Sequence, residues 1–94
     1  MCEWDAEKGR KNLLKHGVSF DEAATAFGDP AGLDGLDAAH SIDEIRYLRV
    51  ATSALGRILT IAYTVRSKPN GTQKIRLISA RKASRKEKRS YQET

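Results

Sequence analysis

The feature that most constrains the fold is the stretch of residues 57–66, the most apolar run in the chain. Its sequence, RILTIAYTVR, is rich in β-branched side chains and carries charge only at its two ends. Such a run is typical of a central strand that is buried on both faces. We therefore expect a sheet to form around this segment, with neighbouring strands supplied by the second half of the chain.

Further strands are predicted at residues 45–52 and 73–80, with weaker candidates at residues 3–5 and 33–36. Pro69-Asn70-Gly71 predicts the turn before the strand at 73–80, because Asn and Gly tolerate a positive φ. Along that strand, strict alternation places Arg81 on the same face as Ile75 and Leu77.

Two helices are predicted ahead of the strands. The first follows Asp5, which can cap it, and ends at Gly17. Its apolar stripe comprises Ala6, Leu13 and Leu14. The second helix begins at the capping box of Ser19 and Glu22 and stops before Pro30. Its apolar positions recur at helical spacing, at Phe20, Ala23, Ala24 and Phe27.

The last segment, from Ala83 onward, consists mainly of good helix formers, but only Ala83 and Tyr91 are apolar in it. A helix this polar gains little from packing on its own core, so it is either frayed or awaiting a partner. The whole order of elements predicts one α+β domain over residues 1–94. We expect two N-terminal helices packed on a twisted antiparallel sheet of three or four strands, followed by a C-terminal helix.

Positive charge is concentrated at the end of the chain. The formal net charge is +5, and residues 81–94 hold six basic and two acidic residues, a net of +4. This distribution favours a polyanionic partner, which could be RNA, DNA or an acidic protein. The alternative is a solvated terminal helix without a ligand.

Several classes of protein are disfavoured by the composition. Cys2 is the only cysteine, which excludes an internal disulfide, and together with His16 and His40 it lacks the spacing of metal ligands. No apolar run approaches the length of a membrane span, and the N-terminus lacks the regions of a secretory signal. We therefore expect a cytoplasmic protein with no metal, no other cofactor and no membrane association.

Five segments of the chain together form a specific pattern. They are Trp4-Asp5-x-x-Lys8 continuing to Asn12-Leu13-x-Lys15-His16-Gly17-Val18-Ser19-Phe20, Glu22-Ala23-Ala24 running to Phe27-x-Asp29-Pro30, His40-Ser41 with Glu44-x-Arg46, Gly56-Arg57 leading to Tyr63-Thr64, and Arg76-Leu77-Ile78-Ser79-Ala80-Arg81-Lys82-Ala83 followed by Arg85-Lys86-Glu87 and Tyr91. Through these segments the chain resembles the BrnT family of bacterial type II toxin–antitoxin toxins over almost its whole length. The stretch at residues 31–39 departs from the pattern, being less strand-like than in the family, as does Ile45, where an acidic residue is common.

The resemblance implies a RelE-like fold and a ribonuclease activity that inhibits translation and growth. It also implies an antitoxin partner, a BrnA-like ribbon-helix-helix protein encoded beside the toxin. We expect a 2:2 heterotetramer that binds operator DNA through the antitoxin.

RNA can be cleaved without a cofactor, because its 2′-hydroxyl can attack the adjacent phosphate once a base removes the proton. Arginine matches the oxygens of the charged phosphorane, and histidine suits proton transfer near neutral pH. The predicted catalytic residues are Arg81, Arg57, Arg46 and His40. No motif of a metal-dependent or nucleotide-binding enzyme is present, which favours metal-independent chemistry or no catalysis.

Each of these residues also has an ordinary structural interpretation. Arg81 needs a carboxylate partner or a ligand, so it could form a stabilising ion pair instead. Arg57 could be a strand-end charge. Arg46 alternates in register with Leu48 and Val50 and so could point to the apolar side, or form an inter-strand ion pair. His40 could be a loop histidine without a role.

The predicted RNA-binding residues are Lys15, His16, Arg76, Lys82, Arg85 and Tyr91. The lysines could equally be solvated, His16 could stabilise the end of the first helix, and Tyr91 could anchor the terminal helix. Two other functions stay open at this stage. One is a non-catalytic basic nucleic-acid-binding module, and the other is a structural protein whose terminal helix only docks a partner.

Overall fold

The structure, a computed structural model, describes residues 2–93. Its elements in chain order are β1 (Cys2–Glu3), α1 (Ala6–His16), α2 (Phe20–Thr25), the 3-10 turn η1 (Ala26–Gly28), β2 (Leu33–Leu36), the 3-10 turn η2 (Ala38–His40), β3 (Tyr47–Thr52), β4 (Ile58–Ser67), β5 (Gln73–Lys82) and α3 (Arg85–Gln92). No helix among these residues is long and apolar enough to cross a membrane.

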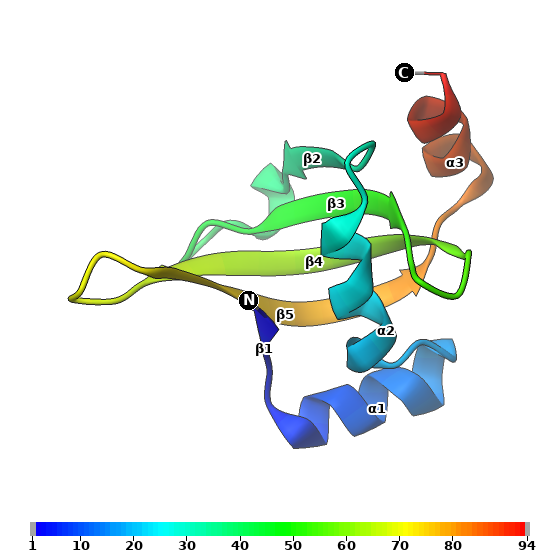
Figure 1. Cartoon of the computed structure of the whole chain (residues 1–94). Helices are drawn as coiled ribbons and strands as arrows, with labels where there is room; N and C mark the ends of the chain where they lie inside the picture. The colour runs from blue at the N-terminus through cyan, green and yellow to red at the C-terminus, as the bar shows by residue number, and fades with distance from the viewer. Residues whose placement is uncertain (1, 94) are drawn as a thin grey trace.

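The five strands form one sheet in the order β1-β5-β4-β3-β2 (Figure 1). Neighbouring strands are antiparallel except β1, which runs parallel to β5. The α+β class predicted from the sequence is confirmed. The prediction of an antiparallel sheet of three or four strands is wrong, because the weak candidates near residues 3–5 and at 33–36 both pair at the edges.

The apolar run at 57–66 is the central strand β4, as predicted. Leu59 and Ile61 are fully buried on the face covered by α2, and Thr60 and Thr64 on the opposite face are only 2% and 1% exposed. The core around this strand comprises Val18, Phe20, Ala23, Ala26, Ala51, Leu59, Ile61, Tyr63, Leu77 and Ala80. β4 is therefore buried on both of its faces, as expected of a central strand.

Helix α1 attaches to the sheet by a polar side chain instead of the predicted apolar stripe. Leu13 and Leu14 are 47% and 82% exposed, whereas Asn12 is buried. The Asn12 amide donates to the carbonyls of Val18 (2.9 Å) and Ala80 (2.8 Å) and accepts from the N–H of Ala80 (3.0 Å). Because β1 pairs only with Ile75 and Arg76, Asn12 serves as the partner of β5 beyond the end of β1.

Strand β5 contains a bulge that reverses the predicted orientation of Arg81. Tyr63 pairs with Leu77 and Ala62 with Ser79, so Ile78 has no partner on β4. A bulge of this kind shifts the alternation by one residue, and Leu77 and Ala80 both reach the core. Arg81 therefore lies on the face opposite to Leu77, and its predicted placement with Ile75 and Leu77 is wrong.

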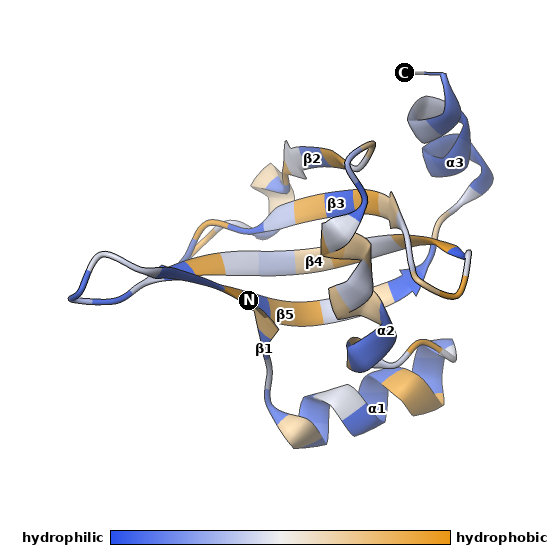
Figure 2. Cartoon of the chain, in the orientation of Figure 1, coloured by the Kyte–Doolittle hydropathy of each residue, from blue (hydrophilic) through white to orange (hydrophobic). Residues whose placement is uncertain are grey.

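Helix α3 is formed despite its polar sequence, which Figure 2 shows as a hydrophilic ribbon at the end of the chain. It begins at a capping box in which Ser84 accepts from the N–H of Glu87 (3.1 Å) and Glu87 accepts from the N–H of Ser84 (2.8 Å). The side chains of Glu87 and Tyr91 then connect the helix to the sheet by hydrogen bonds. Polar contacts thus replace the apolar packing that the sequence lacks.

Candidate active site: a groove on the open face of the sheet

The face of the sheet opposite α2 carries a shallow groove of about 270 Å³. Its lining residues are Asp37, His40, Arg46, Leu48, Ala62, Ile78, Ser79 and Arg81. His40 and Arg46 also border a neighbouring hollow of about 530 Å³ over the loop at residues 39–46. Three of the four predicted catalytic residues, Arg81, Arg46 and His40, are therefore brought to one groove from separate segments of the chain.

The floor of the groove is small and largely apolar. Leu48 of β3 is opposite Ala62 of β4, and Ala62 is opposite Ser79 of β5. The bulge adds Ile78, which lines the same groove. The groove therefore combines this mostly apolar floor with the cationic side chains of Arg46 and Arg81.

Arg46 forms no ion pair with a carboxylate among residues 2–93, whereas Arg81 pairs with Glu87. The side chain of Arg46 lies on the same side of the sheet as that of Leu48, as alternation predicts, but this side carries the groove and not the core. The inter-strand ion pair that was its structural alternative is not present in the described chain. A guanidinium in this position can donate to an anionic ligand without first leaving a partner.

His40 is oriented by an acidic neighbour. Its Nδ1 lies 3.0 Å and 3.1 Å from the two carboxylate oxygens of Asp37, whose side chain is 15% exposed. A carboxylate at that distance favours the tautomer with the proton on Nδ1. The second ring nitrogen, Nε2, takes no part in the contact with Asp37.

Arg81 binds Glu87 of α3 through both terminal nitrogens. The Nη1–Oε1 and Nη2–Oε2 distances are 2.7 Å and 2.9 Å, and Thr60 donates to the same carboxylate at 2.8 Å. The hydrogen bonds from Arg81 are the largest cause that lowers the pKa of Glu87, to about 2. Arg81 therefore does form the ion pair that is its structural interpretation, although its side chain is 43% exposed and still lines the groove.

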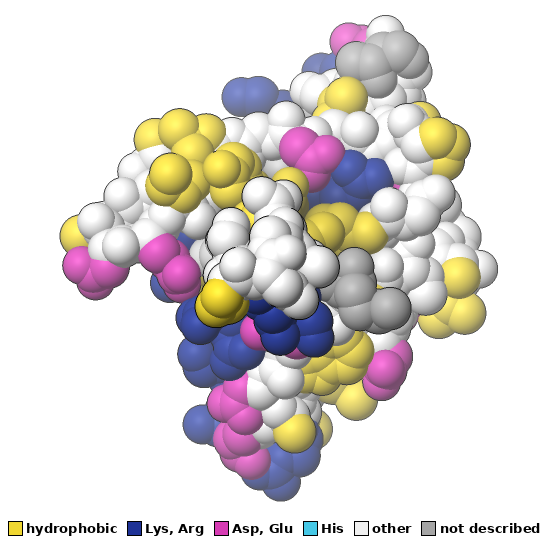
Figure 3. All heavy atoms as spheres, turned by 60° about the vertical axis from the view of Figure 1, so that its left-hand side comes forward, with side chains coloured by type: hydrophobic (Ala, Val, Ile, Leu, Met, Phe, Trp, Pro, Cys, Tyr) yellow, Lys and Arg dark blue, Asp and Glu magenta, His cyan; other side chains and the backbone are white. Residues whose placement is uncertain are grey.

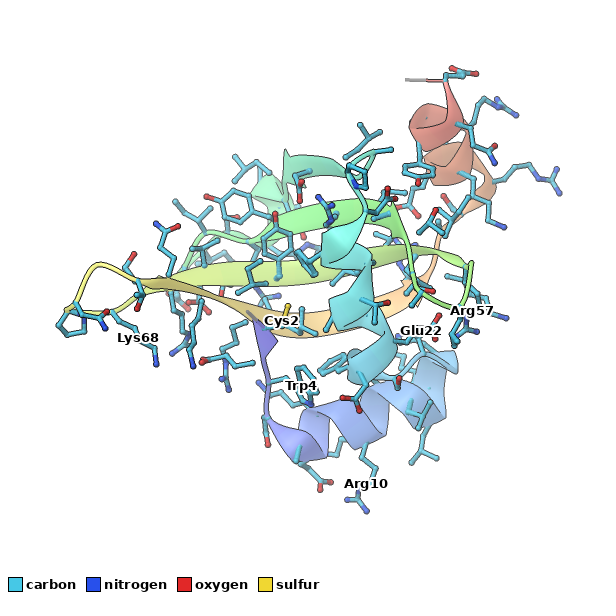
Figure 4. All side chains as sticks on the ribbon, in the orientation of Figure 1. Cys2, Trp4, Arg10, Glu22, Arg57 and Lys68 are labelled. Carbon is cyan, nitrogen blue, oxygen red and sulfur yellow. The ribbon has the colours of Figure 1, made fainter. Side chains whose placement is uncertain are left out.

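Arg57, the fourth predicted catalytic residue, does not line this groove. Its guanidinium contacts the Glu22 carboxylate through Nε (2.9 Å) and Nη2, and Figure 4 shows the two side chains facing each other. It also donates to the carbonyl of Gly17 (3.1 Å), while the Ser53 hydroxyl donates to Glu22 (2.7 Å). The hydrogen bond with Arg57 lowers the pKa of Glu22 and raises that of Arg57. Arg57 thus joins α2 to the start of β4.

The predicted RNA-binding residues are spread over several surfaces. Lys15 and His16 border a hollow beside α1, Lys82 a second one with Arg57, and Arg85 a third on α3. Arg76 pairs with Glu3 at 3.3 Å near the β4–β5 hairpin. Figure 3, which brings this hairpin end forward, shows Lys and Arg side chains gathered next to acidic ones.

Tyr91 lies where the alternative interpretation placed it, as an anchor of the terminal helix. Its hydroxyl donates to the carboxylate of Asp29 (2.5 Å) and lies 2.8 Å from the hydroxyl of Thr52. The N–H of Thr52 donates to the same Asp29 carboxylate (2.9 Å), and together these bonds lower the pKa of Asp29. Contact between Tyr91 and RNA stays a prediction.

Two residues that shape the groove, Asp37 and Glu87, and one buried cation on the opposite face of the sheet, Arg49, are not identified from the sequence. Asp37 orients His40, and their spacing of three residues within one turn was the available signal. Glu87 was part of a Ser84-x-x-Glu87 capping pattern that the sequence does contain. Arg49, one of the most buried cations, pairs with Asp34 at 2.5 Å and donates to backbone carbonyls of the α2–β2 connection, a long-range contact with no local signal.

The described residues contain no group of three or more His, Cys, Asp or Glu side chains that could hold a metal ion. The groups that do converge on the groove are cationic or able to transfer protons. Arginine side chains and a histidine oriented by an aspartate are suited to bind a phosphodiester and move its protons. The fold and groove thus define a small basic α+β protein with the groups expected of a phosphodiester-cleaving enzyme.

Comparison with known families gives the same class. The family described as "Ribonuclease toxin, BrnT, of type II toxin-antitoxin system" matches residues 4–87. This match covers most of the chain, and the chain belongs to the BrnT family of ribonuclease toxins, which confirms the resemblance found in the sequence. A search of curated proteins finds no match.

Proposed function

We propose that this chain is a metal-independent endoribonuclease toxin with a RelE-like fold, and that its active site is the groove between β3, β5 and the loop at residues 37–46. The observation that carries this proposal is the convergence of His40, Arg46 and Arg81 on one groove. All three side chains are of the types that bind a phosphodiester or transfer its protons. Membership of the BrnT family supports a ribonuclease toxin of a type II system.

The proposed reaction is an internal transesterification. The 2′-oxygen of the ribose loses its proton to a base and attacks the adjacent phosphorus, and the bond between phosphorus and the 5′-oxygen breaks. An acid gives a proton to that 5′-oxygen, so the products are a 2′,3′-cyclic phosphate and a 5′-hydroxyl. His40, with Nδ1 held by Asp37, performs one of the two proton transfers through Nε2.

The charge that develops on the phosphorane needs cationic donors. Arg46 meets this need directly, since no carboxylate pairs with it in the described chain. Arg81 contributes when the phosphate competes with Glu87 for the guanidinium, a competition between two anions of similar geometry. The floor formed by Leu48, Ala62 and Ile78 can accept the face of a nucleobase between these donors.

The partner we propose is a BrnA-like ribbon-helix-helix antitoxin that occludes the toxin in a 2:2 heterotetramer and binds operator DNA. Its docking site includes α3, where Arg85, Lys88 and Arg89 border a hollow of about 280 Å³. Such a helix offers an acidic partner several cations. The free toxin then acts in the cytoplasm, where cleaving RNA blocks translation and growth.

A direct experiment is to incubate the purified chain with RNA, with and without ribosomes, and to analyse the ends of the products. We expect 2′,3′-cyclic phosphate ends and activity that persists in EDTA. Cleavage that stops in EDTA and returns with magnesium would show that the proposed chemistry is wrong. A folded chain that binds RNA but cleaves none under either condition would instead support the non-catalytic binding module.

Antitoxin docking is tested by reversing charge on α3 without touching Glu87 or Tyr91. Arg85→Glu combined with Lys88→Glu should weaken binding of the co-expressed antitoxin in a pull-down assay, because the substitution repels an acidic partner. The control is Arg66→Glu combined with Lys68→Glu on the β4–β5 hairpin, which makes the same change in net charge. Equal binding by both variants would remove α3 from the docking site.

A further inference from the structure

Helix α1 presents a row of lysines that the proposed chemistry does not use. Lys8, Lys11 and Lys15 are spaced at i, i+3 and i+7, which places them on one face of the helix. All three are exposed. Together with Asn12, His16, Ile78 and Ser79 they line a hollow of about 220 Å³.

None of these three lysines forms an ion pair within residues 2–93, in contrast to Arg10, which binds Glu7 on the same helix. The acidic side chain nearest in sequence is therefore already occupied by another cation. An unneutralised row of ammonium groups on an ordered helix attracts phosphates more strongly than a mixed surface does. The lysine face of α1 is thus the part of the helix best suited to an anionic ligand.

The lysine face and the proposed active-site groove meet at the bulge in β5. Ile78 and Ser79 line both hollows, because the extra residue in β5 brings these consecutive side chains to the border between them. Asn12 holds α1 at this border by its bonds to the backbone of Ala80. A chain that leaves the groove past the bulge therefore reaches the lysines directly.

We propose that Lys8, Lys11 and Lys15 form a binding track for the backbone of single-stranded RNA next to the cleaved bond. This inference rests on the proposed function, since it takes RNA as the ligand of the groove. The track is about 10 Å long, from the helical rise between Lys8 and Lys15. Lysine is a point charge that binds phosphate without reading the base, so the track adds affinity and position but no sequence preference.

Single-stranded RNA is favoured over an acidic protein segment by the continuity of the two hollows. The reacting phosphate occupies the groove, so the phosphates that follow it in the same strand have to continue across the border or away from it. The track offers them unpaired cations at that point. An acidic segment of a partner has no comparable reason to begin at Ile78 and Ser79.

The test compares two variants with the same loss of charge. The first is K8Q/K11Q/K15Q, and the control on the β4–β5 hairpin is R66Q/K68Q/K74Q. The probes are 2′-O-methyl RNA strands of about 12 and about 3 nucleotides, whose blocked 2′-oxygen prevents cleavage. Binding is measured by fluorescence anisotropy over a range of salt concentrations, and folding of each variant is checked by thermal unfolding.

For the long strand, the α1 variant should reduce the slope of log Kd against log salt by about 2, because each contact with a single strand contributes about 0.7. Binding of the short strand and the slope of the hairpin variant should stay close to those of the unmodified chain. An equal reduction in both variants would overturn the track, since net charge alone would explain it. An unchanged slope together with lost antitoxin binding would overturn it by assigning the lysine face to the partner.

The outcome is separable from that of the proposed function. A chain that binds the long strand through α1 but cleaves no RNA refutes the enzyme and supports the track. A chain that cleaves RNA while the α1 variant keeps its full salt slope supports the enzyme and overturns the track.

Discussion

Replacing Arg81 with alanine tests whether this arginine binds phosphate or only holds α3. If it stabilises the phosphorane, the loss should be about 2.7–4 kcal/mol of transition-state stabilisation, by analogy with the removal of an oxyanion donor. That corresponds to a reduction of kcat by roughly 10²–10³. Initial rates on a fluorogenic RNA at saturating concentration measure it directly.

The same substitution also removes the tether of α3, and its effect on stability can be worked from the ion pair. Arg81 is the main cause that holds the pKa of Glu87 at about 2 instead of 4.5. Taken at full value this shift is roughly 3 kcal/mol, but solvent screening of a partly exposed pair reduces it to about 1–2 kcal/mol. This contribution is present above about pH 4.5 and is lost as the pH falls toward 2. Urea unfolding of Arg81→Ala at pH 7 should show that deficit.

Glu87→Gln separates the two roles of Arg81. It weakens the tether in the same way as Arg81→Ala, but it releases the guanidinium and removes a negative charge beside the groove. We expect a similar loss of stability together with kcat/KM that is unchanged or several-fold higher. Equal losses of kcat/KM in both variants would show that Arg81 acts only through α3. A folded Arg81→Ala protein with full activity would refute the catalytic assignment outright.

Further predictions concern three other contacts. His40→Ala should lower kcat by about 10²–10⁴, the range of general acid–base catalysis, and Asp37→Asn should lower it less because Asp37 only orients the ring; unchanged saturating rates would contradict both. Asn12→Ala should lower the free energy of unfolding in urea by about 3 kcal/mol, because three buried backbone groups lose their partner; a deficit near zero would mean that water replaces the amide. Glu22→Gln should lower the free energy of unfolding above about pH 4.5 and flatten its decline in acid. The hydrogen bond with Arg57 lowers the pKa of Glu22, and the stabilisation it gives is lost as the pH falls through that lowered pKa. Unfolding curves of the variant that keep the same pH dependence would argue against this role.

Much of the fold follows from local signals that act within a few residues. The Asp5 cap, the left-handed Gly17 (φ 70°) and the apolar run at 57–66 all formed what the sequence predicted. The way in which α1 attaches to the sheet cannot be predicted from local signals, because Asn12 makes its hydrogen bonds with Val18 and Ala80. The partner on β5 is far away in sequence, so no periodicity within the helix reveals it.

The bulge in β5 is the main reason that strict alternation predicts the wrong face for Arg81. Alternation of side chains between the two faces assumes that each residue of β5 pairs with one residue of β4. The extra residue, Ile78, shifts this alternation, so every later residue of β5 lies on the face opposite to the predicted one. The sequence around it is apolar at Leu77, Ile78 and Ala80, so either register would bury hydrophobic side chains. With the bulge, Arg81 lies on the face of the sheet that carries the groove.

The two arginines of the β3 region show what alternation can and cannot decide. It correctly groups Arg46 with Leu48 and separates it from Arg49. It does not identify the core face, because both faces of β3 carry apolar side chains. Arg49 is buried because Asp34 and two backbone carbonyls satisfy its guanidinium, and these partners belong to segments that only the folded chain brings close.

The position of Glu87 links the two proposed ligands of this toxin. A phosphate that binds Arg81 competes with Glu87, and Glu87 is one of the side chains that hold α3 on the sheet. Binding free energies are reciprocal, so a partner that stabilises the docked position of α3 also strengthens the hold of Glu87 on Arg81 and weakens RNA binding by the same factor. An antitoxin seated on α3 could therefore inhibit the groove without filling it. Occlusion by the antitoxin and competition between Glu87 and phosphate respond differently to a change at Glu87. Inhibition by competition disappears when Glu87 loses its charge, whereas inhibition by occlusion does not.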